Sequence, residues 1–201
     1  MSTATVVRPE KDHIEIILSD WAGVILGGCR GSTTLNLIDL KGNRANRTVV
    51  EKAISSSDLV LYFGHGSKDK IGNPNAIFDN VNIYHCSGKI LIAVACDVAF
   101  ELGQKAIKNG AKSFLGFDDE LVVYLGKLSL FGSIFEQALL PLLTSSSTIS
   151  EARDKMGALF MALEGYYRNA GKNHPDAPLI WMAAHINWRG LQAFGDLSAR
   201  I

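Results

Sequence analysis

The sequence predicts an α/β fold in which helices cover both faces of a mostly parallel central sheet. Residues 58–67 and 89–97 are apolar over the length of a strand and end in glycines or small residues, which is typical of strands buried on both faces. Strand-like runs alternate with segments whose apolar residues recur at helical spacing, and this order favours parallel strands joined by right-handed crossovers. The 201 residues suit one domain, and we expect residues 1–201 to form a single unit.

The first elements are predicted within residues 1–40. After a polar lead, residues 13–19 are rich in β-branched side chains and are predicted to form the first strand, which ends at Ser19 and Asp20. Residues 21–34 contain four glycines and no sustained period, so we expect an irregular loop there. The glycine spacing matches neither the P-loop nor the dinucleotide fingerprint, which makes nucleotide binding a poor hypothesis. Residues 35–40 are the second predicted strand.

The middle of the chain carries the two apolar runs and the helices around them. Residues 47–56 are predicted to form a helix, because their apolar side chains fall on one face. The segment between the two runs is polar and rich in turn residues, so we expect a loop rim there, with a small hairpin at residues 76–84. A helix at residues 97–110 and a strand at 112–117 should follow the second run.

The last third of the chain is predicted to be largely helical. Residues 124–143 have apolar side chains at helical spacing. Thr148 or Ser150 can cap a further helix that ends near residue 169, and Glu151 suits the positive end of its dipole. Residues 178–196 close the chain and contain the final predicted strand.

Two reactive side chains follow the two apolar strands. His65 comes just after the first and Cys96 just after the second. If the strands are parallel neighbours, both side chains lie at the carboxyl edge of the sheet, where open α/β sheets bind their ligands. They would then form a His/Cys dyad, in which the imidazole and the start of the next helix lower the pKa of the Cys96 thiol. Gly66 has no Cβ, so its N–H and that of Cys96 are candidates for an oxyanion hole.

These motifs resemble those of the caspase-like cysteine peptidases of clan CD. The residues that carry the resemblance are Tyr-Phe-Gly-His-Gly at 62–66 and Ile-Ala-Val-Ala-Cys-Asp at 92–97. The CHAT branch is the most similar, because its Ala-Cys motif precedes a helix and a strand like the Gly-Ala-Lys-Ser-Phe-Leu-Gly segment at 110–116. Pro178, Trp181 and Gly195-Asp196 also resemble the end of CHAT domains, although the longer spacing here leaves the register of the final strand open.

The resemblance implies a caspase-like three-layer sandwich and a cysteine endopeptidase in which His65 assists Cys96. It implies no cofactor and does not require an acidic third member of the site, and none is evident from the sequence. Such domains in bacteria often belong to defence or stress systems, antiviral defence among them, and act on a protein substrate after activation by a partner. A catalytically inactive caspase-like binding module is the alternative.

The resemblance also places the first substrate pocket at residues 118–124. Asp118 and Asp119 would then pair with Arg or Lys before the cleaved bond, unless they only solvate a turn. Asp20 is the competing pocket acid. Metacaspases have an acid two positions before the nucleophile, where this chain has Val94, and this removes one source of basic preference.

Composition limits the other classes of function. Lys plus Arg and Asp plus Glu number 20 each, so the net charge of zero gives no general case for direct binding of nucleic acid or of an anionic membrane. The apolar runs are too short to span a bilayer, the N-terminus lacks a signal peptide pattern, and three cysteines are too few for a disulfide framework, so we expect a cytoplasmic protein. His65, His85, Cys86 and Cys96 lack the spacing of zinc ligands, and no Gly-x-Ser-x-Gly elbow of a serine hydrolase occurs.

Overall fold

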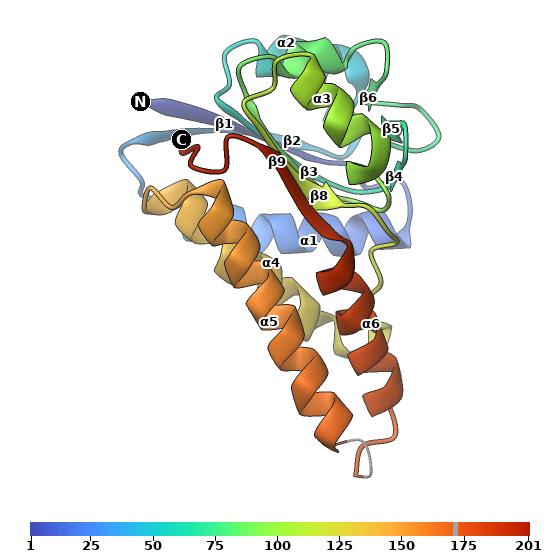
Figure 1. Cartoon of the computed structure of the whole chain (residues 1–201). Helices are drawn as coiled ribbons and strands as arrows, with labels where there is room; N and C mark the ends of the chain where they lie inside the picture. The colour runs from blue at the N-terminus through green and yellow to red at the C-terminus, as the bar shows by residue number, and fades with distance from the viewer. Residues whose placement is uncertain (171–172) are drawn as a thin grey trace.

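The protein is built around a six-stranded sheet with helices on both faces (Figure 1). The computed structural model describes residues 1–170 and 173–201. The strand order is β2-β1-β3-β7-β8-β9, and every neighbouring pair is parallel except β8 and β9. The predicted α/β class with a mostly parallel sheet is therefore confirmed.

The N-terminal prediction was wrong in its order of elements. The first strand is β1 (Ser2–Arg8), and residues 13–28, predicted as a strand and a loop, form helix α1 (His13–Gly28). Asp12 caps this helix by accepting a hydrogen bond from Glu15 N–H at 2.9 Å, and Glu15 accepts from Lys11 N–H at 2.8 Å. These caps and the burial of one face outweigh the weak strand preference of isoleucine at positions 14, 16 and 17.

The next elements agree with the sequence. Strand β2 (Leu35–Lys41) and helix α2 (Arg47–Ile54) lie within a residue or two of their predicted bounds. Strands β3 (Leu59–Phe63) and β7 (Ile90–Val94) are buried throughout, as their uniform apolar character predicts. The rim between them contains a small antiparallel sheet of β4 (Gly66–Ser67), β5 (Lys70–Ile71) and β6 (Phe78–Asp79) and a helical turn, η2 (Ile83–Cys86). The hairpin predicted at residues 76–84 is wrong, because β6 pairs with β5 and η2 follows it.

The helix after Cys96 starts later than predicted. A wide helical turn, η3 (Ala99–Gly103), comes first, and α3 (Gln104–Lys108) continues from it. Strand β8 (Ser113–Phe117) is followed by the irregular segment 118–124, a short turn η4 (Leu125–Lys127) and helix α4 (Leu128–Thr144).

Two long helices and a strand end the chain. Helix α5 (Ile149–Ala170) is capped by Thr148, one of the two caps that the sequence predicts. Thr148 and Glu151 form a reciprocal capping box with hydrogen bonds of 2.7 and 3.1 Å, which the sequence analysis did not predict. Helix α6 (Ala177–Gly190) leads directly into β9 (Leu191–Gly195), which pairs antiparallel with β8 and sets Phe194 opposite Phe114. This settles the register that the sequence left open.

The sheet separates two apolar cores. Helices α1, α4, α5 and α6 cover one face, and α2 and α3 cover the other (Figure 1). Helices α5 and α6 also extend together beyond the sandwich. No helix in the described part of the chain is long and apolar enough to cross a membrane.

Candidate active site

The structure places His65 and Cys96 at the same edge of the sheet. Strands β3 and β7 are parallel neighbours whose register pairs Phe63 with Val94, and each reactive residue stands two positions further on. The loops after the strands stay in contact, since Gly64 N–H donates to Val94 C=O at 3.2 Å. The predicted placement of both residues at one carboxyl edge is therefore confirmed.

An aspartate that the sequence reasoning missed holds the imidazole. The His65 Nε2 atom lies 2.7 Å from Asp12 Oδ2, while the other oxygen of Asp12 caps α1. The imidazole itself is about a quarter exposed, with 28% of its side chain accessible. Burial alone would raise the pKa of Asp12, but the Glu15 N–H and His65 hold it below its ordinary value. The signal in the sequence was the Asp12-x-x-Glu15 capping pattern before an apolar run.

The Cys96 sulfur faces the segment that follows β8. Leu121 N–H lies 3.4 Å from Cys96 Sγ and points its hydrogen at the sulfur. Directly after Cys96, Asp97 takes a left-handed backbone conformation with φ of 59°, which is uncommon for a residue with a side chain. Its N–H donates to Asp119 C=O at 3.0 Å, so the turn that carries Cys96 is tied to the end of β8.

The pKa of the Cys96 thiol is raised, contrary to the prediction. Burial is the main cause, and the carboxylates of Asp97 and Glu120 add to it, while the Leu121 N–H opposes it. The helix that was expected to lower this pKa begins only at Ala99. The thiol is thus protonated near neutral pH, and an adjacent base must take its proton before it can act as a nucleophile.

Gly66 lies against the turn that carries Cys96. A Cβ at this position would stand 2.8 Å from the Cys96 carbonyl oxygen and 2.9 Å from the Ala95 Cβ. Only glycine lets the His65 and Cys96 loops approach this closely. The glycine after His65 therefore has a packing reason in addition to its predicted role in an oxyanion hole.

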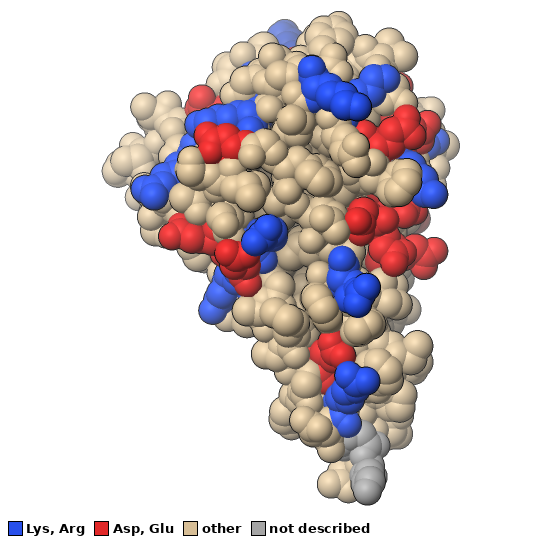
Figure 2. Space-filling view, in the orientation of Figure 1, with Lys and Arg blue, Asp and Glu red and all other residues tan. Residues whose placement is uncertain are grey.

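Acidic side chains gather where β8 ends. Asp118 is half-buried, and Asp119 and Glu120 are exposed. Burial, followed by the neighbouring carboxylates Asp119 and Asp97, raises the pKa of Asp118. Figure 2 shows acidic residues clustered on the side of the molecule where α6 meets β9. The predicted pocket acids Asp118 and Asp119 thus lie on the same sheet edge as Cys96.

Comparisons with known proteins identify a similar fold among solved structures. No family model matches the sequence, and no curated protein matches it. Among solved structures, the crystal structure of the Arg-specific cysteine proteinase gingipain R superposes with a TM-score of 0.61 at 15% identity, covering 99% of this chain and 47% of that one. The chain has a gingipain-like fold. A complex of the pro- and mature domains of RgpB from Porphyromonas gingivalis gives a TM-score of 0.59 at 13% identity, covering 100% of this chain and 48% of that one.

The gingipain-like fold confirms the caspase-like architecture that the sequence motifs imply. The chain spans about half the length of the two proteinase chains it matches. At 15% and 13% identity, the likeness to the two gingipain structures concerns the fold. His65 and Cys96 are the reactive side chains that this fold brings to one edge of the sheet.

Asp20 does not lie where the sequence predicted it. It belongs to the middle of α1 and not to the end of a strand, roughly 12 Å along the helix axis from Asp12 at a rise of about 1.5 Å per residue. It is exposed, and its charge helps to raise the pKa of Arg8. The prediction that Asp20 ends a strand at the carboxyl edge, where it would be a pocket acid, is therefore wrong.

The other cysteines differ from Cys96 in exposure. Cys29 and Cys86 are buried, and burial raises the pKa of Cys86 to about 12. Neither follows a strand at the carboxyl edge of the sheet. In residues 1–170 and 173–201, no group of three or more His, Cys, Asp or Glu side chains is arranged to hold a metal ion.

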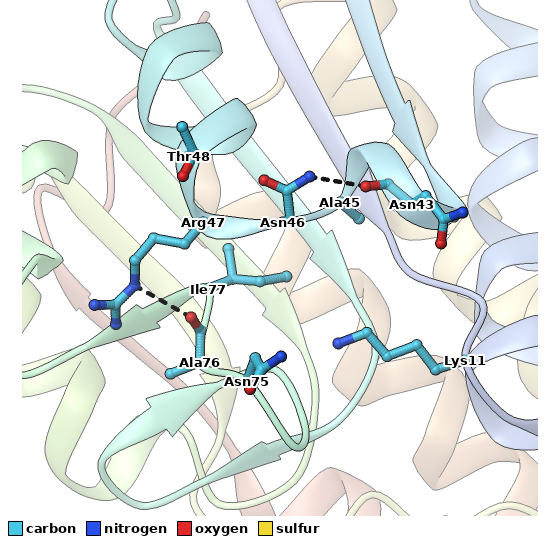
Figure 3. Close-up of a pocket in the computed structure, with 10 residues that line it drawn as sticks. Lys11, Asn43, Ala45, Asn46, Arg47, Thr48, Asn75, Ala76 and Ile77 are labelled. Carbon is cyan, nitrogen blue, oxygen red and sulfur yellow. Dashed lines mark hydrogen bonds between the residues drawn. The ribbon is translucent and has the colours of Figure 1, made fainter.

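A cavity of about 350 Å³ opens beside the site, at the ends of β1 and β2 (Figure 3). Lys11, Asn46 and Arg47 contribute polar groups, and Ile77 contributes an apolar wall. Arg47 donates to Ala76 C=O at 3.2 Å and forms an ion pair with Asp79, so its charge is already neutralised. The cavity lining includes no Cys, His, Asp or Glu, and Lys11 in its wall precedes Asp12, the residue that holds His65.

Proposed function

We propose that the protein is a cysteine endopeptidase in which His65 and Cys96 act on a peptide bond. The observation that carries this proposal is the placement of both residues at the ends of adjacent parallel strands, with a carboxylate on the far nitrogen of the imidazole. The gingipain-like fold supports it. A partly buried, protonated thiol at the same sheet edge as a carboxylate-bound imidazole suits a mechanism that begins with general base catalysis.

The mechanism follows from the hydrogen bond to Asp12. Because the carboxylate accepts from Nε2–H, the neutral His65 carries its free electron pair on Nδ1, which can take the proton of Cys96 Sγ. The thiolate attacks the peptide carbonyl carbon, and the C–N bond breaks as the imidazolium gives its proton to the leaving amine. An acyl-thioester remains on Cys96. Water, deprotonated by the same imidazole, hydrolyses it and regenerates the thiol.

When Cys96 Sγ attacks, the oxygen of the substrate carbonyl becomes an oxyanion, which needs hydrogen-bond donors beside it. We assign the N–H groups of Gly66 and Cys96 to that role, because the glycine loop lies against the nucleophile's own turn. Removing one such donor typically costs about 10² to 10³ in kcat.

Residue preference forms part of the proposal. The carboxylates of Asp118 and Asp119 lie at the end of β8, beside the turn of the nucleophile, and a cationic side chain before the cleaved bond would neutralise them. We therefore propose cleavage after Arg or Lys.

The wider role follows from the order of motifs. The resemblance of the sequence motifs to those of CHAT domains supports a regulated peptidase of a bacterial defence or stress system. We propose a protein substrate and an activating protein partner. The raised pKa of the thiol is compatible with a resting state that such a partner would switch on.

The test is a panel of fluorogenic peptides that differ at the residue before the cleaved bond. The wild-type protein is expected to release fluorophore, while Cys96→Ala and His65→Ala variants of unchanged thermal stability are not. Turnover by Cys96→Ala equal to the wild-type rate would show that another group performs the cleavage.

A second candidate is an inactive binding module of the same fold. The raised pKa of the Cys96 thiol favours it, because a protonated thiol is a poor nucleophile. A module would leave every peptide intact and would not be modified by a peptidyl chloromethyl ketone, whereas the endopeptidase would be alkylated on Cys96.

A further inference from the structure

A buried asparagine of α6 holds the segment that contacts the nucleophile. Asn187 is 0% exposed, and its side-chain amide makes two hydrogen bonds to one residue. Its Oδ1 accepts from Val122 N–H at 2.8 Å, and its Nδ2 donates to Val122 C=O at 2.7 Å. The amide thus satisfies both backbone groups of Val122, as a neighbouring strand would.

Leu121, the residue before Val122, makes the contact with the Cys96 sulfur. Leu121 N–H points at Cys96 Sγ at 3.4 Å. A single side-chain amide reaches both backbone groups of Val122, as it does on an extended backbone. In such a backbone, successive N–H groups point to alternate sides, so fixing Val122 also fixes the direction of Leu121 N–H. The Asn187 side chain therefore determines which donor the sulfur meets.

We propose that Asn187 is a positioning residue for Cys96, acting through Val122 to hold the Leu121 N–H against the sulfur. This inference rests on the proposed function only in what the sulfur does, because the hydrogen bonds exist in the protein without substrate. A donor to sulfur stabilises the thiolate more than the thiol, and so eases transfer of the proton to His65.

The contact between Asn187 and Val122 also connects the site to helices α5 and α6. Asp118 N–H donates to Gly190 C=O at 2.8 Å, so the segment after β8 is bound to α6 at two points. Helix α6 packs along α5, and Glu164 of α5 accepts a hydrogen bond from Trp188 at 2.6 Å. A displacement of α6 would therefore carry Val122 and the Leu121 N–H with it.

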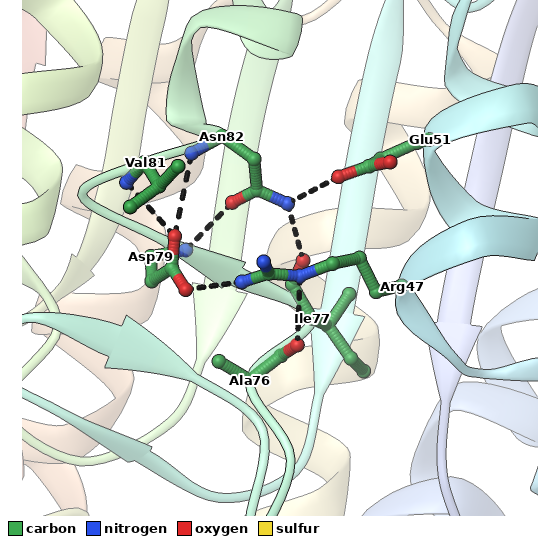
Figure 4. Close-up of polar contacts among 7 residues, drawn as sticks. All are labelled: Arg47, Glu51, Ala76, Ile77, Asp79, Val81 and Asn82. Carbon is green, nitrogen blue, oxygen red and sulfur yellow. Dashed lines mark hydrogen bonds and ion pairs between the residues drawn. The ribbon is translucent and has the colours of Figure 1, made fainter.

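The test compares Asn187→Leu with a matched control elsewhere. Asn82 is also a buried asparagine, 4% exposed, whose amide donates to Ile77 C=O and Glu51 and accepts from Asp79 N–H (Figure 4). Asn82→Leu removes three side-chain hydrogen bonds, one more than Asn187→Leu, and none of them involves the segment that contacts the sulfur. The charged and titratable groups around Cys96, namely Asp97, the acids at 118–120 and His65, are the same in both variants.

The readout is the rate of alkylation of Cys96 by iodoacetamide against pH, with each protein's thermal unfolding measured alongside. Asn187→Leu is expected to move the profile to higher pH and to slow alkylation near neutral pH roughly tenfold, the equivalent of losing one hydrogen bond to a charged group. Asn82→Leu should lose a similar amount of thermal stability and keep the wild-type profile. A folded Asn187→Leu protein with the wild-type profile would overturn the proposal.

Two further measurements keep the result decisive. If Asn187→Leu does not fold, Asn187→Ser, whose side chain is too short to bind both groups of Val122, takes its place with the same expected direction. In the wild-type protein, amide exchange should show slow exchange at Val122 and fast exchange at Val123, whose N–H has no acceptor among the described residues. Equal exchange at the two positions would contradict the proposal. Peptidase activity is not needed for either readout, so a failure of the proposed function would be recognised separately.

Discussion

Cys96 occupies a setting that favours its neutral form. Burial and the nearby carboxylates raise the pKa of the thiol, and the backbone N–H groups of Leu121 and of Cys96 itself act in the opposite direction. The chemistry of the site therefore depends on a base that removes a proton, and not on a thiolate that is already present.

The pH dependence of alkylation tests this point. Because a raised pKa means that the thiolate fraction grows only in alkaline solution, iodoacetamide labelling of Cys96 should accelerate continuously from pH 7 upward. The rate is measured by mass spectrometry of the labelled peptide. A rate that already levels off below pH 7 would indicate a preformed thiolate and contradict the assignment.

Asp12 has two roles that substitutions can separate. Asp12→Asn keeps an acceptor for Glu15 N–H, since asparagine caps helices as well as aspartate does, but it removes the negative charge beside His65 Nε2. We expect kcat to fall by roughly tenfold to a hundredfold, a fraction of what a general base contributes, with thermal stability nearly unchanged. Asp12→Ala should lose the same activity and the helix cap as well. Wild-type kcat in Asp12→Asn would remove Asp12 from the site.

At the scale of the element, the sequence identified the strands that position the site because burial on both faces makes a strand uniformly apolar. Strands β3 and β7 have this character, and their ends led to His65 and Cys96. The same rule failed at the N-terminus. Strand β1 begins with Ser2 and Thr3 and looked polar, although Thr5 is buried against Ser57 Oγ at 2.6 Å.

The error at β1 concealed Asp12. With residues 13–19 assigned to a strand, Asp12 was only a lead residue, and its place beside His65 depends on β1 ending next to β3 in the sheet. Contacts between segments more than fifty residues apart, such as Asp12 with His65 or Val122 with Asn187, follow from topology and leave no local pattern in the sequence.

The capping box of α5 provides a test at this scale. Thr148→Ala removes the hydroxyl that accepts from Glu151 N–H and should lower the free energy of unfolding by about 1 kcal/mol. The hydrogen bonds from Thr148 hold the pKa of Glu151 below its ordinary value, so its part of the box is present at neutral pH and lost as the pH falls through that lowered pKa. Thr148→Ala keeps the backbone N–H that donates to the Glu151 carboxylate, so the pH test uses Glu151→Ala. Denaturant unfolding at neutral and acidic pH should show a difference in the free energy of unfolding between wild type and Glu151→Ala that narrows in acid. A difference that is constant with pH would show that Glu151 takes no part.

For the whole molecule, the fold brings four acidic residues to the sheet edge that carries Cys96. Asp97 ends the turn after β7, and residues 118–120 follow β8, although the net charge of the chain is zero. This local excess of negative charge is the basis for the proposed preference for cationic substrates.

Peptide turnover tests that preference. The wild-type protein should turn over peptides with Arg before the cleaved bond faster than matched Leu peptides. Asp118→Asn or Asp119→Asn should lower kcat/KM for the Arg peptides roughly tenfold to a hundredfold, because each removes a charged hydrogen bond. The Leu peptides serve as the internal control and should change little. Equal turnover of Arg and Leu peptides by the wild-type protein would remove these acids from the pocket.

The central claim is that His65 and Cys96 work as one catalytic pair, and labelling with a peptidyl-arginyl chloromethyl ketone tests it most directly. Intact-mass and peptide analysis should find a single adduct on Cys96 in the wild-type protein. His65→Ala should form the Cys96 adduct at least tenfold more slowly. This is a conservative threshold, because a general base typically contributes about 10² or more to the rate. Labelling of His65→Ala at the wild-type rate, or an adduct on another residue, would contradict the account.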